Sequence, residues 1–144
     1  MQSNVFSTKK TLNLRGRILD LSTPKVMGIL NVTPDSFYDG NRHITVSTAL
    51  HQTEKMVSEG ADIIDIGGYS SRPGADDISE AEELSRVVPI IEGIRKEFSE
   101  LIISIDTFRT PVATAAIDSG ASIINDISAG DVLPSVFDLL AAVQ

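Results

Sequence analysis

Polar side chains close four short apolar runs of this 144-residue sequence, and their types and spacing could carry chemistry. The residues that close the runs are, in order, Asn31, Asp65, Asp106, and Asn125 with Asp126. Carboxylates and amides accept hydrogen bonds, and amides also donate them, so such a set could hold a polar ring or a hard cation. Any one of these residues could instead cap neighbouring backbone or begin a turn. Polar residues at all four run ends favour a binding site.

Two loops add further candidate groups. Residues 33–37, Thr-Pro-Asp-Ser-Phe, follow Asn31, and their simplest interpretation is a Pro-Asp turn. Residues 67–75, Gly-Gly-Tyr-Ser-Ser-Arg-Pro-Gly-Ala, contain glycines that let backbone N–H groups approach a ligand, and Arg72 offers a fork of donors suited to phosphate. Beside Asn31, such a loop suggests a phosphate or pyrophosphate group held with Mg²⁺. The sequence contains no nucleophile elbow, P-loop or G-x-G-x-x-G pattern.

The four apolar runs must position these groups. They are rich in Ile and Val, which predicts strands of a parallel sheet with both faces covered. The runs are residues 26–32, 63–67, 101–107 and 122–127. Ahead of them, residues 11–21 alternate apolar and polar side chains around Gly16, which predicts a β-hairpin that could close one end of a barrel.

Helix signals separate the runs. Thr45 can cap a helix that stops at Gly60, and Ser79 with Glu82 forms a capping box for a helix that runs toward Phe98. Thr110-Pro111 opens a third helix that stops at Gly120, and a fourth is expected from Leu133-Pro134 onward. Pro89 predicts a kink or a break in the second helix.

An internal echo indicates a repeated unit, because residues 59–64 and 119–124 each carry a glycine followed by an Ile-rich run. Alternating strands and helices with short joints predict a parallel α/β fold with right-handed crossovers. A barrel of eight βα units needs about 250 residues. Four units and a hairpin account for residues 1–144, so the chain is either a small open α/β domain or the first half of a longer barrel.

Composition narrows the function classes. With 42% hydrophobic and 22% charged residues, the chain is expected to be one globular domain spanning residues 1–144. The absence of cysteine excludes disulfides and thiolate metal sites and fits a reducing compartment. A net charge of −8 without a basic block argues against a nucleic-acid partner. No apolar run reaches the roughly 20 residues of a membrane helix, and the polar start lacks a signal peptide, so we expect a cytoplasmic protein without a membrane partner.

The ordered motifs resemble those of the dihydropteroate synthases. The resemblance extends from about Leu19 to Ile127, and its first motif is highly specific. The motifs are residues 26–37, residues 64–68 with residues 71–75, residues 103–107, and residues 124–127. The resemblance implies a (β/α)8 TIM barrel, of which the first four βα units and the amino-terminal β-hairpin are present. It also implies the joining of 6-hydroxymethyl-7,8-dihydropterin pyrophosphate to p-aminobenzoate with release of pyrophosphate, in folate biosynthesis, by an enzyme class that sulfonamides target.

The resemblance also implies roles for individual residues, none of which is a protein nucleophile. Asn31 would hold Mg²⁺ and the pyrophosphate, while Ser71 and Arg72 would contact the phosphates and the aminobenzoate side. Asp106 and Asn125 would hydrogen-bond the pterin ring. Two further residues would belong to mobile loops that close around the aminobenzoate, namely Phe37 and Pro73.

The sequence departs from the family pattern in the second loop. Tyr69 stands where the family usually has Glu, and Ser71 stands where Thr is usual. The family's second half, with another pterin-binding Asp, a Ser-Arg-Lys segment and an Arg-x-His pair, has no counterpart here, so we expect the 144-residue chain to be inactive alone. Two alternatives remain at this point, a pterin-dependent methyltransferase that uses methyltetrahydrofolate and a corrinoid, and a non-catalytic half-barrel that self-associates, for instance as a homodimer.

Overall fold

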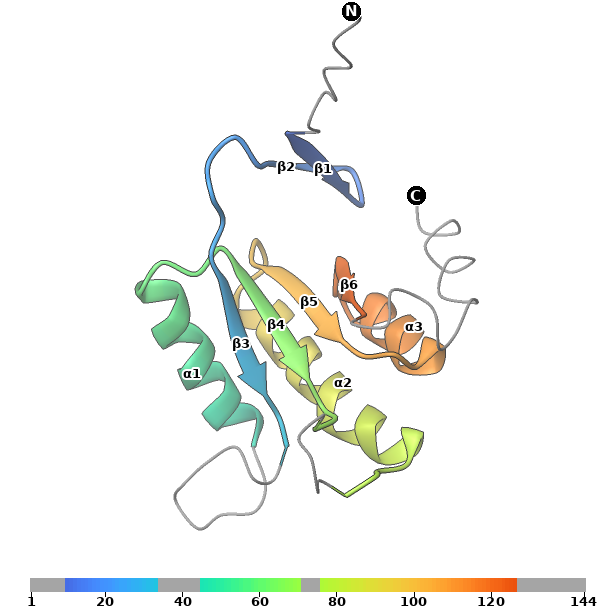
Figure 1. Ribbon diagram of the computed structural model, residues 1–144. Coiled ribbons are helices and arrows are strands. Elements are labelled where there is room, and N and C mark those ends of the chain that lie inside the picture. The colour runs from blue at the N-terminus through green and yellow to red at the C-terminus, as the bar shows by residue number, and fades with distance from the viewer. Residues whose placement is uncertain (1–9, 34–44, 71–75, 127–144) are drawn as a thin grey trace, which may run out of the picture.

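A parallel sheet forms the frame of the protein. A computed structural model describes residues 10–33, 45–70 and 76–126, and its parallel strands run in the order β3-β4-β5-β6 (Figure 1). The strands are β3 (Met27–Asn31), β4 (Ile63–Gly67), β5 (Ile102–Asp106) and β6 (Ile123–Asn125). Each strand therefore pairs with the next one along the chain, as successive βα units of a barrel do. The four predicted strands are confirmed.

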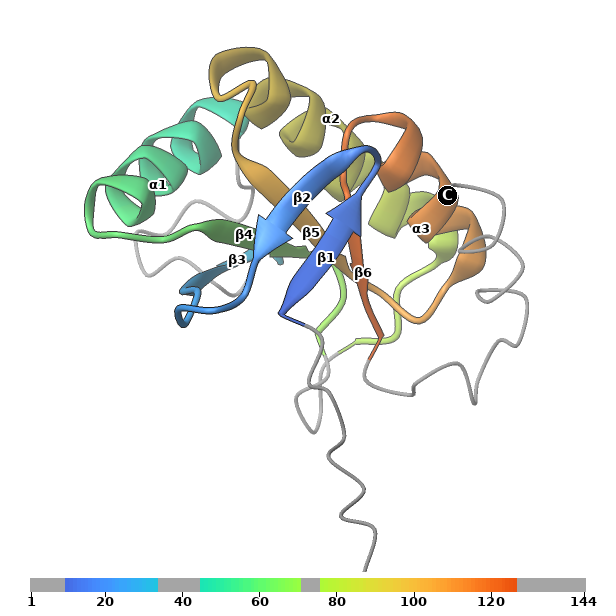
Figure 2. The same ribbon diagram turned by 90° about the horizontal axis from the view of Figure 1, so that it is seen from above.

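Three helices cover one face of this sheet (Figure 2). They are α1 (Val46–Ser58), α2 (Glu80–Glu97) and α3 (Thr110–Asp118). The core lies between the two layers, where Ile64 and Ile66 of β4 and Ile103 and Ile105 of β5 have no solvent exposure. None of the helices in the described ranges is long and apolar enough to cross a membrane.

Both predicted N-caps are present, but the capping box predicted for Ser79 with Glu82 is only half formed, because the Glu82 carboxylate binds Arg86 instead. The hydroxyl of Thr45 accepts a hydrogen bond from the Thr48 N–H, and the hydroxyl of Ser79 accepts one from the Glu82 N–H. At the other end, α1 is followed by Gly60 at φ +106° and α3 by Gly120 at φ +119°, a region where glycine carries no steric cost.

The internal echo corresponds to two identical helix-to-strand joints. Gly60 and Ala61 donate their N–H groups to Val57 and Met56, which is the Schellman pattern. Gly120 and Ala121 repeat the pattern at the end of α3, donating to the carbonyls of Ile117 and Ala116. After these joints the chain enters the next strand of the sheet, β4 after α1 and β6 after α3.

Helix α2 contains Pro89, where the sequence predicts a kink or a break. The helix continues through this residue to Glu97, so of these two alternatives the break does not occur. Its flanking residues Val87, Ile90 and Ile91 are buried, and their packing offsets the hydrogen bond that proline cannot donate. The fourth helix, expected from Leu133 onward, lies outside the described residues.

The predicted hairpin is present as β1 (Thr11–Leu14) and β2 (Arg17–Asp20), which pair antiparallel. It lies over the amino ends of the parallel strands (Figure 1). Leu14 and Leu19 form a small apolar cluster with Ile63 and Ile102, the first residues of β4 and β5. The hairpin thus covers one end of the strands, as the sequence predicted.

Candidate functional site

Three predicted site residues lie in one row at the carboxyl ends of the strands. Asn31 pairs with Gly67, Gly67 with Asp106, and Asp106 with Asn125. A Cβ atom at Gly67 would lie 3.5 Å from Asn31 Oδ1 and 3.6 Å from Asp106 Oδ2, so the two side chains flank this glycine. Their predicted convergence at one end of a parallel sheet is confirmed.

Asp65 lies one layer deeper than the sequence predicted. It is in the middle of β4, two residues before the strand ends, where it pairs with Ile29 and Ser104. Because side chains alternate along a strand, Asp65 shares a face with Gly67 and points beneath the polar row. Only 2% of its surface is exposed.

Asp65 fixes the orientation of Asn125. The amide Nδ2 of Asn125 donates to Asp65 Oδ2 across 2.9 Å, and a carboxylate can only accept this bond. The amide oxygen of Asn125 is therefore directed elsewhere and is available as an acceptor. Within the described residues, Asp65 Oδ1 and the adjacent Ser104 hydroxyl are both buried without a hydrogen-bond partner. Orphaned polar atoms beside a row of polar side chains mark a place for a polar ligand or water.

Negative charge accumulates at this edge. Burial raises the pKa of the Asp106 carboxyl above its usual value, and neighbouring carboxylates raise it further. These carboxylates belong to Asp65, Glu83 and Asp126. A ligand that brings N–H donors would compensate the charge, because each donor stabilises the ionised form.

A buried ion pair supports the edge from behind. Glu83 of α2 is fully buried and accepts hydrogen bonds from the Thr107 hydroxyl at 2.8 Å and from Arg109 Nη1 at 2.6 Å. Arg109 Nη2 also donates to the Ile78 carbonyl at 2.8 Å. These bonds connect the segment after β5 to the start of α2. These bonds were not predicted from the sequence, although an acidic residue on the apolar stripe of α2, four residues before Val87, was a usable signal.

Tyr69 joins this supporting cluster. Its ring packs edge-on against Phe108 at a centroid distance of 5.2 Å, and the guanidinium of Arg109 lies 5.2 Å from the Tyr69 ring centroid. At Gly68 a Cβ atom would lie 2.7 Å from Val87, so only glycine lets the chain pass this close to α2. Where the family resemblance expects a Glu, Tyr69 thus meets an arginine through its aromatic face.

The remaining predicted site residues lie outside the described ranges, namely Phe37, Ser71, Arg72 and Pro73. Among the residues that the structure describes, no group of three or more His, Asp or Glu side chains is arranged to hold a metal ion. Asn31 is the one predicted metal ligand, and its side chain lies at the exposed carboxyl end of β3. A single amide oxygen suits Mg²⁺ only when water and substrate oxygens complete the coordination.

Comparisons with known proteins place the chain in a family. A family model described as pterin binding enzyme matches residues 27–144. The Bacillus subtilis dihydropteroate synthase is 57% identical over 102 residues, which are 71% of this chain and 35% of that protein. The Haemophilus influenzae dihydropteroate synthase is 51% identical over 118 residues, or 82% of this chain and 42% of that protein.

Solved structures show the same similarity. The Xanthomonas albilineans dihydropteroate synthase with 4-aminobenzoic acid superposes with a TM-score of 0.84 at 46% identity, covering 94% of this chain and 49% of that one. The same enzyme in complex with 7,8-dihydropteroate gives a TM-score of 0.79 at 43% identity, covering 92% and 47%. The chain spans less than half the length of these relatives. Its fold is that of the first strands and helices of their (β/α)8 barrel.

Proposed function

This chain belongs to the family of pterin-binding enzymes, and on that premise we propose that its carboxyl edge binds the pterin substrate of a dihydropteroate synthase. In the proposed reaction the amine of p-aminobenzoate attacks the methylene carbon of 6-hydroxymethyl-7,8-dihydropterin pyrophosphate. A C–N bond forms as the C–O bond to pyrophosphate breaks, and the amine loses a proton. The relatives' names support this assignment, and they give no support to the methyltransferase alternative.

The observation that carries the proposal is the adjacency of Asp106 and Asn125 over a buried Asp65. The amino-pyrimidine part of a pterin presents neighbouring N–H donors and ring acceptors. An ionised Asp106 accepts the donors, while Asn125 offers its fixed amide oxygen and its second N–H. The ring's donors would also relieve the repulsion among the carboxylates, which gives the carboxyl edge a preference for such a ligand.

The pyrophosphate side of the proposal rests on Asn31 and on the second loop. An exposed amide oxygen at the end of β3 fits Mg²⁺ that is held mainly by substrate phosphates. When bound, Mg²⁺ neutralises charge that develops on the leaving pyrophosphate. Ser71 and Arg72 would donate to the same phosphates, and Phe37 and Pro73 would bound the aminobenzoate position. The proposed reaction needs no protein nucleophile.

We also propose a cytoplasmic location, which the cysteine-free sequence supports.

The test compares Asp106→Asn with Asp118→Asn, an equal change at the exposed end of α3. Both are introduced into the chain after it replaces the matching segment of the Bacillus subtilis synthase. We expect Asp106→Asn to weaken binding of the pterin pyrophosphate by about 1–3 kcal/mol, because a pterin donor loses its acceptor. Asp118→Asn should leave the affinity unchanged. Equal affinity of the two variants, measured by calorimetry on folded protein, would remove Asp106 from the site.

The 144-residue chain alone is expected to give no steady dihydropteroate formation, because it spans less than half the length of the relatives that carry the activity. Turnover at a rate near that of an intact synthase, lost on Asn31→Ala, would refute this expectation.

One observation favours a second candidate, a self-associating half-barrel. Strand β3 exposes Met27 and Ile29 at 38% and 52% of their surfaces, beside an exposed Val26. Apolar side chains on an edge strand favour association with another copy. Size-exclusion chromatography tests this, since the candidate requires a homodimer or larger species that Ile29→Lys converts to monomer.

A further inference from the structure

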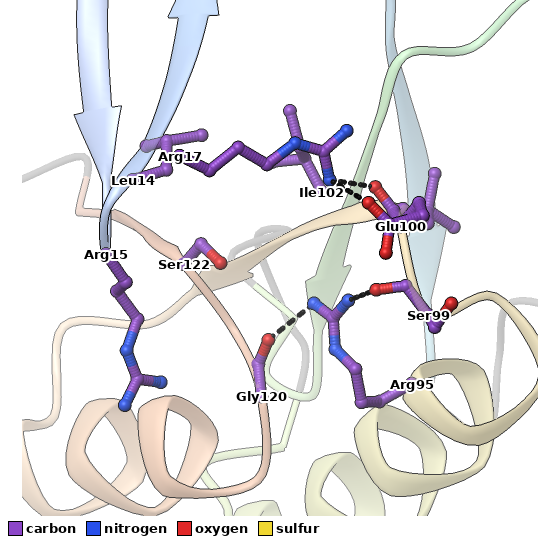
Figure 3. Close-up of a pocket in the computed structure, with 10 residues that line it drawn as sticks. Leu14, Arg15, Arg17, Arg95, Ser99, Glu100, Ile102, Gly120 and Ser122 are labelled. Atoms are coloured by element: carbon purple, nitrogen blue, oxygen red, sulfur yellow. Dashed lines mark hydrogen bonds and ion pairs between the residues drawn. The ribbon is translucent and has the colours of Figure 1, made fainter.

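A cavity of about 310 Å³ lies at the opposite end of the strands from the carboxyl edge. The hairpin turn covers one side of it, and the segments that lead into β5 and β6 form the other (Figure 3). Three arginines line it, namely Arg15 and Arg17 from the hairpin and Arg95 from α2. We call it the amino-end cavity. It shares no residue with the proposed pterin site.

The cavity carries an excess of positive charge. Glu100 is the one carboxylate among its lining residues, against three guanidinium groups. Its ion pair with Arg17 spans 3.5 Å, and the two side chains are 52% and 85% exposed, so solvent screens it strongly. In a chain of net charge −8, a quarter of the twelve Lys and Arg residues meet at this one place. Because like charges repel, this clustering of three arginines requires a physical explanation.

Capping of backbone carbonyls explains part of the arrangement. Arg15 donates to the Ile117 carbonyl at 2.8 Å. Arg95 donates to the carbonyls of Gly120 at 2.7 Å and Ser99 at 2.5 Å (Figure 3). These bonds satisfy carbonyls at the ends of helices α3 and α2.

Each guanidinium has five N–H groups, however, and these bonds use one or two of them. Carbonyls at helix C-termini carry only partial negative charge, so capping compensates the guanidinium charges only in part. Burial lowers the pKa of Arg95, repulsion by Arg17 and Arg15 lowers it further, and Glu100 opposes this shift in part. An anion in the cavity would add to the compensation that Glu100 provides.

We propose that the amino-end cavity binds the phosphate group of a small molecule. Three arginines offset by one exposed glutamate match the charge of a phosphate dianion, and planar guanidinium forks match its oxygens. The Ser122 hydroxyl and the backbone at Gly120 add polar groups to the wall. A volume of about 310 Å³ exceeds that of phosphate alone, so the site has room for the organic part of a phosphate ester.

The experiment titrates the full 144-residue chain with inorganic phosphate and with glycerol 3-phosphate at constant ionic strength, following backbone amide shifts by NMR. The test variant is Arg17→Gln. The matched control is Lys25→Gln, because Lys25 has a single ion pair of the same 3.5 Å length, with Asp62, and does not line the cavity. Arg15→Gln serves as a second test variant. The melting temperature of each variant shows that it remains folded.

The proposal predicts saturable binding, with the largest shifts at Gly16, Gly120 and Ser122. Arg17→Gln and Arg15→Gln each weaken binding about tenfold, the loss of one charge-assisted hydrogen bond, whereas Lys25→Gln changes it less than twofold. If inorganic phosphate binds more tightly than glycerol 3-phosphate, the ligand is the free ion, and if glycerol 3-phosphate binds more tightly, the ligand is a phosphate ester. Either result supports the site. Non-saturable shifts, equal losses in test and control variants, or shifts confined to residues around Gly67 and Asp106 would each overturn the proposal.

Discussion

At the amino ends of β4 and β5 the first residues, Ile63 and Ile102, pack against the hairpin, whereas the same two strands end in Gly67 and Asp106 at a polar edge. One end of the sheet is covered by apolar side chains, and the other leaves amides and carboxylates uncovered. Both ends concentrate charge, but of opposite sign. The amino end of the sheet is therefore built mainly for packing, and the carboxyl end is built mainly for polar contacts.

The apolar packing of the hairpin at the amino end is complete without a ligand. Leu14 and Leu19 bury apolar surface, and the nearby arginines donate to backbone carbonyls. The carboxyl edge is different, because Asp65 Oδ1 has no partner among the described residues, and burial and neighbouring carboxylates raise the pKa of Asp106. The hairpin packing therefore stabilises the amino end by itself, whereas the carboxyl edge keeps buried polar atoms whose interactions a substrate can complete.

The largest expected effect tests what holds the carboxyl edge in place. Arg109→Ala leaves Glu83 fully buried without its cation, which should lower the free energy of unfolding by about 3–5 kcal/mol. Urea unfolding followed by circular dichroism measures the loss. The control Arg86→Ala removes an ion pair with the half-exposed Glu82 and one hydrogen bond to Gly68, worth about 1 kcal/mol. Equal losses in the two variants would show that the buried pair does not support the edge.

The next effect tests the apolar closure of the amino end. Leu19→Ala should lower the free energy of unfolding by about 2–3 kcal/mol, since it removes buried methyl groups between the hairpin and the sheet. The adjacent Ile18 is 63% exposed, so Ile18→Ala should stay within about 0.5 kcal/mol of the unchanged protein. Both are measured by urea unfolding. A loss at Ile18 as large as that at Leu19 would contradict the packing described.

Much of the fold could be predicted because its signals are local in the sequence. The predicted run at residues 63–67 matches β4 at both ends, and Thr45, Ser79, Gly60 and Gly120 mark helix ends by their own chemistry. Pro89 was a local signal that packing overrode. The convergence of Asn31, Asp106 and Asn125 followed from strand direction alone.

The features that were missed depend on contacts between distant residues. The depth of Asp65 depends on its register against Ser104, which no local pattern shows. Glu83 and Arg109 are 26 residues apart, and the amino-end cavity joins Arg15 and Arg17 of the hairpin to the distant Arg95 of α2. The absence of a basic block in the sequence therefore did not exclude a basic site, because folding of the hairpin over the sheet creates it.

The smallest expected effect concerns Asp106, where one substitution should change the stability of the fold and the binding of the pterin in opposite directions. The raised pKa of Asp106 means that the folded protein holds this proton more tightly than the unfolded chain does. Stability is therefore lost as pH rises between the unfolded and the folded pKa, and the full cost is present above the folded pKa. Asp106→Asn removes that cost.

The variant should thus be more stable than the unchanged chain at pH 7.5, by a few tenths of a kcal/mol to about 1 kcal/mol, although it binds the pterin less well. The difference should shrink as pH falls through the folded pKa, and it should vanish below the ordinary Asp value of about 4. Urea unfolding at several pH values measures it, with the exposed Asp118→Asn as the control expected to stay within about 0.5 kcal/mol throughout. A variant that is less stable at neutral pH, or a gain that does not depend on pH, would mean that Asp106 supports the fold and that the carboxyl edge is not held in an unfavourable state for its ligand.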